Sequence, residues 1–264
     1  MKRITPRAIA AMKGAEKIAC LTAYDFQTAR LLDAAGIPLI LVGDSLGTTL
    51  LGYDNTLPVT LVDMIRHAAA VVRGVQRALV VIDMPFMTYQ ASVEQALRNC
   101  GRAIQKTGCH AVKIEGGAFR APTIAALVQN GIPVLGHIGL TPQSVKVLGT
   151  RVQGRGDEAA QQLIADARAI AAAGAFAIVL EAVPADLGAQ VSAAVEVPVI
   201  GIGAGPGCDG QILVINDVLG LSGDFKPKFV KVYADLGKQI SAAAAAYKAD
   251  IEASAFPGPE HAYE

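Results

Sequence analysis

The chain has 264 residues, close to the roughly 250 of a single eight-stranded α/β barrel, although length alone leaves two small domains open. Hydrophobic residues make up 52% and charged residues 17%, a composition that indicates a large buried core and argues against disorder. The formal net charge is zero and no long basic cluster occurs, which argues against nucleic acid and anionic membrane surfaces as partners.

No apolar run approaches the roughly 20 residues that span a bilayer, and charged residues from Lys13 onward interrupt any signal-peptide core. The four cysteines lack the CxxC or Cys/His spacing of a metal site; they are Cys20, Cys100, Cys109 and Cys208. We therefore expect free, buried thiols and a cytoplasmic protein.

Apolar, β-branched segments alternate with helix-period segments from about residue 17 to 220. We expect strands at 17–22, 38–43, 78–82, 110–114, 133–137, 176–180, 197–202 and 211–215. Helices are expected at 26–35, 60–72, 92–106, 121–129, 158–172 and 185–194, with long loops at 48–58 and 138–156. Thr60, with Asp63 three residues later, and Ser92 are expected helix caps.

This alternation predicts a parallel sheet with helices outside it. Eight strands favour a closed barrel over an open sheet, and the glycine-rich turn at 201–207 comes too late for a Rossmann start. We expect one domain over 1–264, with the barrel at about 17–220 and a C-terminal helical extension at about 226–264. The extension would contain a linker-like segment at 226–230 and an Ala-rich helix at 236–253.

Charged side chains recur where the apolar runs end. Asp44, Asp83, Glu115, His137 and Glu181 each stand at or just past the end of a predicted strand, and Lys113 shares a strand face with Glu115. Carboxylates there are costly to bury unless they are paired or hold a metal. Loops at the carboxyl ends of barrel strands build the active site, so we expect one shared site.

Each of these residues also has an ordinary structural interpretation. Asp44 and Ser45 could cap a helix, Asp83 could belong to a turn, and Lys113 with Glu115 could form an ion pair across neighbouring strands. His137 could be a core histidine, and Glu181 could anchor a salt bridge at the barrel mouth. Their coincidence at equivalent positions favours the site.

A cluster of like-charged carboxylates needs a cation, and oxygen ligands favour Mg²⁺. Zinc is disfavoured because no Cys or His stands at a ligand spacing. The glycine run at 201–207 stands where many barrels bind phosphate, but glycines equally permit tight turns and close packing.

A series of motifs stands in order along almost the whole chain. They read LTAYD (21–25), VGDSLG (42–47), TLPVT (56–60), MPFMTY (84–89), VKIEGG (112–117), GHIGLTPQS (136–144), VQGRG (152–156), PVIGIGAG (198–205) and DGQILV (209–214). Together they closely resemble the ketopantoate hydroxymethyltransferase (3-methyl-2-oxobutanoate hydroxymethyltransferase) family.

The resemblance implies a (β/α)8 TIM barrel of the phosphoenolpyruvate/pyruvate type, one Mg²⁺ per subunit and 5,10-methylenetetrahydrofolate as cosubstrate on the pantothenate route. It also implies a homodecamer built as a pentamer of dimers. It assigns the metal to Asp44, Asp83 and Glu115, contacts with the 2-oxo acid to Asp44, Ser45, Asp83, Lys113 and His137, and the catalytic base to Glu181.

One position departs from the family pattern. Where the family usually has a His-Asp pair after the eighth strand, this chain reads Ile215-Asn216-Asp217. Asparagine can hydrogen-bond but does not titrate, so this departure argues against a role as proton carrier for position 216.

Two other functions fit the same residues. A metal-dependent aldolase or lyase of small 2-oxo acids would use the same enolate chemistry without folate. A catalytically silent barrel could serve as a scaffold, although the intact acidic residues and Lys113 argue against it.

Overall fold

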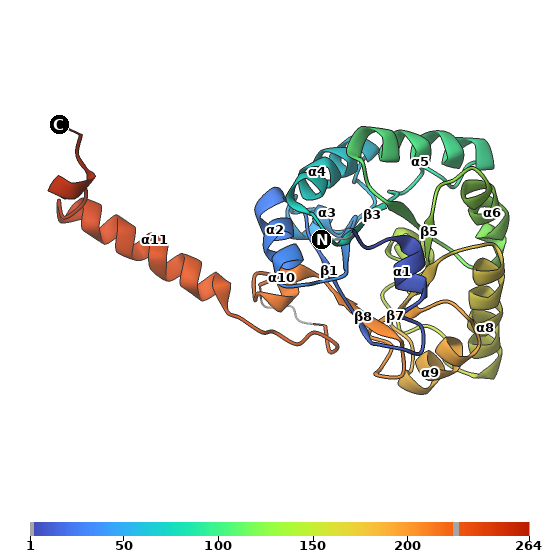
Figure 1. Ribbon diagram of the computed structural model, residues 1–264. Helices are drawn as coiled ribbons and strands as arrows, with labels where there is room; N and C mark the ends of the chain where they lie inside the picture. Colours follow the sequence, from blue (N-terminus) through green and yellow to red (C-terminus); the bar gives the residue numbers. More distant parts are fainter. Residues whose placement is uncertain (1–2, 224–226, 264) are drawn as a thin grey trace. The chain divides into compact units, whose positions relative to one another are not determined.

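The computed structural model describes residues 3–223 and 227–263, and in these the strands close into a parallel barrel in the order β1 to β8 (Figure 1). The strands are β1 (Ile18–Thr22), β2 (Leu39–Val42), β3 (Leu79–Asp83), β4 (Ala111–Glu115), β5 (Val134–Gly139), β6 (Ala177–Glu181), β7 (Val199–Ile202) and β8 (Gly210–Leu213). The predicted (β/α)8 barrel is confirmed.

Longer helices surround the barrel, and their bounds and those of the strands differ from the predicted ones by at most two residues. These helices are α2 (Phe26–Ala34), α4 (Leu61–Gly74), α5 (Val93–Thr107), α6 (Ala121–Gln129), α8 (Asp157–Ala172) and α9 (Ala185–Ala193). Thr60 and Asp63 form the predicted capping box of α4, and Ser92 caps α5 by accepting a hydrogen bond from Gln95 N.

Short elements lie between the predicted strands and helices. These are α3 (Leu46–Thr49), η1 (Ala118–Arg120), η2 (Pro142–Ser144) and α7 (Val145–Leu148), and α1 (Pro6–Ala10) precedes the barrel. Of these, η2 and α7 fall inside the expected loop at 138–156. The eighth strand is also shorter than expected, because Ile215 begins helix α10 (Ile215–Val218) instead of ending β8.

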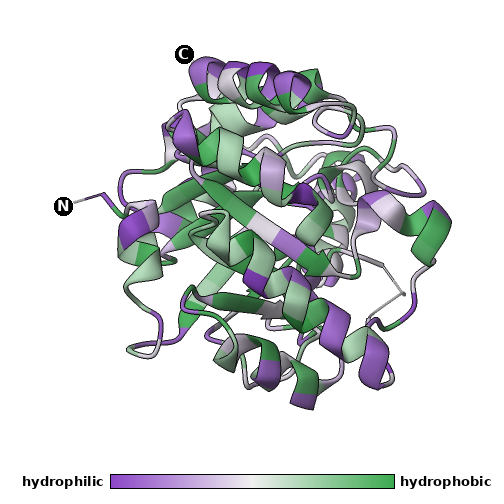
Figure 2. Cartoon of the chain, turned by 90° about the vertical axis from the view of Figure 1, so that its right-hand side faces the viewer, coloured by the Kyte–Doolittle hydropathy of each residue, from purple (hydrophilic) through white to green (hydrophobic). Residues whose placement is uncertain are grey.

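The strands are buried on both faces, which is why they read as continuous apolar runs. Every residue of β2, β3 and β4 is buried. Alternate strand residues such as Leu39, Val81 and Ile200 fill the barrel interior together with Ile9 of α1. Figure 2 shows the apolar strands inside and helices that carry both polar and apolar residues around them.

All four cysteines are free and buried, as predicted. Burial raises the pKa of the Cys100 and Cys109 thiols to about 12, so both stay protonated and unreactive at neutral pH. Within the described ranges, no helix combines the length and the apolar character needed to cross a bilayer.

The chain divides into two compact units, Met1–Val214 and Ile215–Glu264. The second unit contains α10, α11 (Leu236–Glu252) and η3 (Pro259–His261), and its Phe256 ring lies 5.8 Å from the Tyr247 ring of α11. Lys226, at the start of the expected extension, lies outside the described residues. The one-domain organisation stays a prediction.

Candidate active site

The charged residues of the predicted site come together at the carboxyl ends of neighbouring strands. Asp83 ends β3, Glu115 ends β4 and Glu181 ends β6, while Asp44 and Ser45 directly follow β2. The strand register pairs Asp83 with Lys113, Glu115 with His137, and Gly139 with Glu181. Parallel pairing therefore places these side chains at one end of the barrel.

Two chains of charged contacts run through this cluster. Lys113 Nζ lies 2.5 Å from Asp83 Oδ1, and Asp83 Oδ2 accepts a hydrogen bond from Asp44 N at 3.1 Å. His137 lies between two carboxylates, with Nδ1 3.4 Å from Glu115 Oε1 and Nε2 3.2 Å from Glu181 Oε2. Lys113 therefore pairs with Asp83, and His137 contacts acidic groups, unlike an ordinary core histidine.

Ser45 faces the hydroxyl of Tyr24, with the two oxygens 2.8 Å apart in a hydrogen bond. It makes no side-chain cap at the start of α3, so the helix-cap interpretation of this residue is wrong. Gly43 explains how the turn fits, because a Cβ there would lie 2.8 Å from Ser45 Oγ. A side chain at position 43 would displace the serine hydroxyl.

Burial and mutual repulsion shape the ionisation of the carboxylates. Burial, followed by the charges of Asp83 and Glu115, raises the pKa of Asp44 to about 8. Burial also raises the pKa of Asp83, although the Lys113 charge opposes the rise. Asp44 therefore lies in a site that holds more negative charge than Lys113 alone balances.

His137 and Glu115 stabilise each other's charged forms. Burial alone would raise the pKa of Glu115, but its contact with His137 and the charge of Lys113 outweigh burial and lower it. Burial and Lys113 oppose protonation of His137, yet the Glu115 and Glu181 carboxylates raise the pKa of His137 to about 9. At neutral pH the structure therefore favours an imidazolium between two carboxylates.

The donor chemistry of the cluster fits a hard divalent cation. The carboxylates of Asp44, Asp83 and Glu115 are buried together, and their proximity adds to burial in raising the pKa of Asp44, which is the setting that a divalent cation with oxygen ligands would relieve. Among the described residues, no group of three or more His, Cys, Asp or Glu side chains is arranged so that it could hold a metal ion. The assignment of Mg²⁺ to Asp44, Asp83 and Glu115 stays a prediction.

Gln143, on η2, connects the acidic residues and was not among the predicted site residues. Its Nε2 donates to Asp44 Oδ2 at 3.0 Å, and its backbone N–H donates to Glu115 Oε2 at 3.0 Å. Its Oε1 accepts a hydrogen bond from Tyr89 Oη at 2.8 Å, and Tyr89 Oη in turn accepts one from Glu115 N. Gln143 stands in the motif at 136–144, which was the available signal, but no charge or strand end marked it.

The glycine run after β7 serves helix packing. A Cβ at Gly205 would lie 2.4 Å from Ala185 Cβ, and one at Gly207 would lie 2.6 Å from Ala189 Cβ. Both alanines belong to α9. Close approach of this helix therefore accounts for the two glycines without a phosphate.

Fold and site together define a class: closed (β/α)8 barrels with an acidic centre at the carboxyl end of the strands. Solved structures with this fold include 2,3-dimethylmalate lyase, a member of the PEP mutase/isocitrate lyase superfamily, with 18% identity and a TM-score of 0.63 over 98% of this chain and 88% of that chain. Phosphonopyruvate hydrolase has 13% identity and a TM-score of 0.62 over 100% of this chain and 92% of that chain. At such identities the likeness concerns the fold alone.

The chain belongs to the ketopantoate hydroxymethyltransferase family, whose model matches residues 3–259. A 3-methyl-2-oxobutanoate hydroxymethyltransferase of Chloroflexus aurantiacus is 56% identical over 260 residues, 98% of this chain and 92% of that protein. One from Syntrophus aciditrophicus is 52% identical over 264 residues, 99% of this chain and 97% of that protein. The predicted family and the prediction of an enzyme, a hydroxymethyltransferase, are confirmed.

Proposed function

We propose that the protein transfers a hydroxymethyl group from 5,10-methylenetetrahydrofolate to C3 of 3-methyl-2-oxobutanoate, giving 2-dehydropantoate, in the first committed step of pantothenate biosynthesis. Family membership supports the reaction type. The observation that carries the chemistry is the chain of contacts from Glu181 through His137 to Glu115 beside the Lys113–Asp83 pair. This arrangement supplies a base and a buried cation at one end of the barrel.

Glu181 is the proposed base. Its side chain is 17% exposed, whereas those of its charged neighbours are at most 4% exposed, so it is the carboxylate of the cluster most open to a ligand. It would take the C3 proton of the 2-oxo acid, and the electron pair of that C–H bond would move toward the keto oxygen. His137 Nε2, 3.2 Å from Glu181 Oε2, would orient this carboxylate toward the substrate.

Lys113 would offset the negative charge that develops on the substrate oxygens, while Ser45 and His137 orient the substrate. The enolate carbon would then form a bond to the folate methylene carbon. Both C–N bonds of that carbon break, a water oxygen becomes the hydroxyl oxygen, and the two nitrogens of the leaving tetrahydrofolate take one proton from this water and one from Glu181. A divalent cation held by Asp44, Asp83 and Glu115 would supply Lewis-acid stabilisation of the same negative charge.

Glu181→Gln tests the role of the base. We expect exchange of the C3 deuteron of 3-methyl-2-oxobutanoate, followed by NMR in the absence of folate, to fall by roughly 10²–10⁴-fold, the usual contribution of a general base. The isosteric amide keeps the shape of the side chain but accepts no proton. Glu158→Gln, an exposed change on α8, is the matched control and should leave exchange unchanged. Full exchange in Glu181→Gln would assign the base to another group.

Folate dependence separates the transferase from an aldolase or lyase that uses the same enolate. Product formation that requires 5,10-methylenetetrahydrofolate supports the transferase, whereas carbon–carbon cleavage or condensation without folate supports the alternative. Thorough chelation tests the cation: activity should disappear and return with Mg²⁺, and activity that survives chelation would remove the metal from the mechanism.

The family resemblance also supports a homodecamer, a pentamer of dimers, in the cytoplasm. Four free thiols agree with a reducing compartment. Light scattering of the purified protein measures the number of chains per particle.

A further inference from the structure

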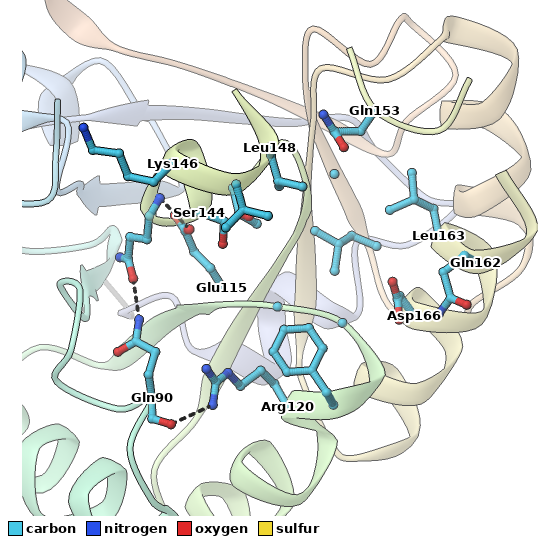
Figure 3. Close-up of a pocket in the computed structure, with 18 of the residues that line it drawn as sticks. Gln90, Glu115, Arg120, Ser144, Lys146, Leu148, Gln153, Gln162, Leu163 and Asp166 are labelled. Carbon is cyan, nitrogen blue, oxygen red and sulfur yellow. Dashed lines mark hydrogen bonds between the residues drawn. The ribbon is translucent and has the colours of Figure 1, made fainter. Parts of the chain in front are cut away.

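A cavity of about 650 Å³ adjoins the acidic cluster, and Figure 3 shows Glu115 on one side of it and Leu163, Gln162 and Asp166 of α8 on the other. Glu115 and Gln143 line both this cavity and the cluster. Among the residues described, Asp44, Asp83, Lys113, His137 and Glu181 do not line it. The cavity is thus a neighbouring compartment that shares one wall with the site.

The walls of this cavity are largely apolar. Phe119 and Val147 line it and are 71% and 83% exposed, so their apolar surfaces are accessible to a ligand. The Arg120 guanidinium lies 5.1 Å from the Phe119 ring and 5.5 Å from the Tyr89 ring, and it donates to Gln90 O at 3.3 Å. These groups form a flat, partly aromatic surface beside Glu115, which suits a flat heteroaromatic ring.

The cavity leads outward into a second one of about 600 Å³. Both are lined by Val147, Leu148, Gln153, Gly154 and Ala159, so their walls are continuous. The outer cavity adds Arg151 and Arg155, and Lys146 lines the inner one. These three exposed cations form no salt bridge within the described part of the chain. The outer end therefore offers positive charge that is free to pair with a ligand.

We propose that the two cavities bind the folate cosubstrate, with the pteridine ring near Glu115, the aminobenzoyl group between Phe119 and Val147, and the glutamyl carboxylates at Arg151 and Arg155. The assignment rests on the proposed transferase function. A folate has a flat polar ring, an apolar spacer and an anionic tail, and the cavities present matching surfaces in that order. The inner cavity alone, at about 650 Å³, falls within the roughly 300–1,000 Å³ of ligand pockets.

This assignment also gives a role to the motif at 152–156, which the acidic cluster does not use. Gly154 must lack a side chain, because a Cβ there would lie 2.4 Å from Leu187 Cδ2 and 2.7 Å from Leu163 Cδ1. The glycine thus packs the segment against α8 and α9, and Arg155 follows it directly into the outer cavity. Each additional γ-linked glutamate adds one carboxylate, so the cations should favour polyglutamylated folates.

The test compares tetrahydrofolate and its pentaglutamate by calorimetry on the assembled enzyme. We expect the enzyme to bind the pentaglutamate at least about tenfold more tightly, as one strong charge-assisted contact would give. Arg151→Ala/Arg155→Ala should remove this preference and leave folate-independent C3 deuteron exchange unchanged. Arg102→Ala/Lys106→Ala, which removes two exposed cations on α5, is the matched control and should keep the preference.

Val147→Asp tests the apolar wall separately, because this exposed position tolerates a polar side chain. It should weaken the binding of tetrahydrofolate and of its pentaglutamate to a similar extent, while deuteron exchange and the number of chains per particle stay unchanged. Loss of assembly in Val147→Asp would instead make this face an interface between copies of the chain. If Arg151→Ala/Arg155→Ala still preferred the pentaglutamate, the glutamyl carboxylates would not bind at Arg151 and Arg155.

These outcomes are distinct from failure of the proposed function. A protein that is no folate-dependent transferase would bind neither folate, whatever the variant. A transferase with its folate elsewhere would bind both folates and show no response to Arg151→Ala/Arg155→Ala or Val147→Asp.

Discussion

Gln143 joins residues that come from three separate strand ends. Its amide contacts Asp44, Tyr89 and the backbone of Met84, and its own N–H contacts Glu115. Every hydrogen-bonding group of this buried side chain is therefore used, and such a network holds its members in one arrangement. We regard Gln143 as a positioning residue, since it acts on the substrate through Asp44 and Glu115.

Gln143→Leu should lower kcat by about 10–100-fold, because it removes a hydrogen bond to a buried carboxylate that contributes about 1.5–3 kcal/mol. We expect KM to change less than kcat, since the fold and the cavity remain. Steady-state kinetics together with C3 deuteron exchange measure both effects. Tyr89→Phe, which removes the hydroxyl between Gln143 and Glu115, should show a weaker loss in the same direction.

Gln105→Leu serves as the control, because Gln105 is exposed on α5 and lies outside the network. A purely structural role for Gln143 would lower thermal stability and leave kcat per folded enzyme unchanged. That result would contradict the positioning role.

The sequence predicted the charged residues of the site because each one ends a buried apolar run. Asp83, Glu115 and Glu181 are the last residues of β3, β4 and β6, so the strand pattern and the chemistry coincide there. Gln143 has no such marker. Gln143 lies on a single turn of 3-10 helix, and its role in the site depends on contacts with residues that are far away in the sequence.

Among the helices, the length of each helix decided whether it could be predicted from the sequence. The longer helices have the apolar periodicity of 3.6 residues and recognisable caps, and their bounds agree with the prediction. Helices α3, α7 and α10 have four residues each, barely more than one turn, so periodicity cannot show them. Tertiary contacts decide whether such a segment becomes a helix or a loop.

Replacing two helical glycines by alanine should change the free energy of unfolding in opposite directions. In Gly188→Ala, on α9, the new Cβ would lie 2.1 Å from Ala204 O, so the helix must move away from the loop after β7. We expect a loss of about 1–3 kcal/mol of unfolding free energy, typical of overpacking. In Gly101→Ala, on α5, no atom lies within 4 Å of the new Cβ. Better helix propensity should then add about 0.5–1 kcal/mol.

Urea unfolding of the two variants measures both values against the wild type. A destabilised Gly101→Ala, or a Gly188→Ala as stable as the wild type, would contradict the packing that we describe for these helices.

Within the first unit, the two ends of the barrel differ in chemistry. The carboxyl end of the strands holds the acidic cluster, where burial and neighbouring carboxylates raise the pKa of Asp44. At the opposite end, Ile9 packs beneath the strands and Lys13 Nζ pairs with Asp209 Oδ2 at 2.7 Å. The same Asp209 oxygen accepts hydrogen bonds from Ser192 Oγ and Val199 N. The charges of Lys13 and Asp209 are therefore paired with each other, as expected for the end of a barrel that contributes stability.

The Asp209 contacts make the stability of this end depend on pH. Burial alone would raise the pKa of Asp209, but hydrogen bonds from Lys13, Val199 N and Ser192 outweigh burial and hold the pKa below its usual range. A carboxyl whose pKa is lower in the folded state stabilises the fold above its unfolded pKa of about 3.9. The stabilisation disappears as the pH falls from about 4 through the lowered pKa of the folded protein.

Asp209→Asn should therefore cost about 1–3 kcal/mol of unfolding free energy at neutral pH, because it removes charge-assisted hydrogen bonds at a mostly buried site. The gap between wild type and variant should narrow as the pH falls below about 4, where the wild-type carboxyl also becomes neutral. Urea unfolding across this range measures the gap. Asp157→Asn, on the exposed first turn of α8, is the control and should show little pH-dependent difference. A free-energy gap for Asp209→Asn that stays constant down to the lowest pH would mean that the shape of the Asp209 side chain, and not its charge, holds Lys13, Ser192 and Val199 together at this end of the barrel.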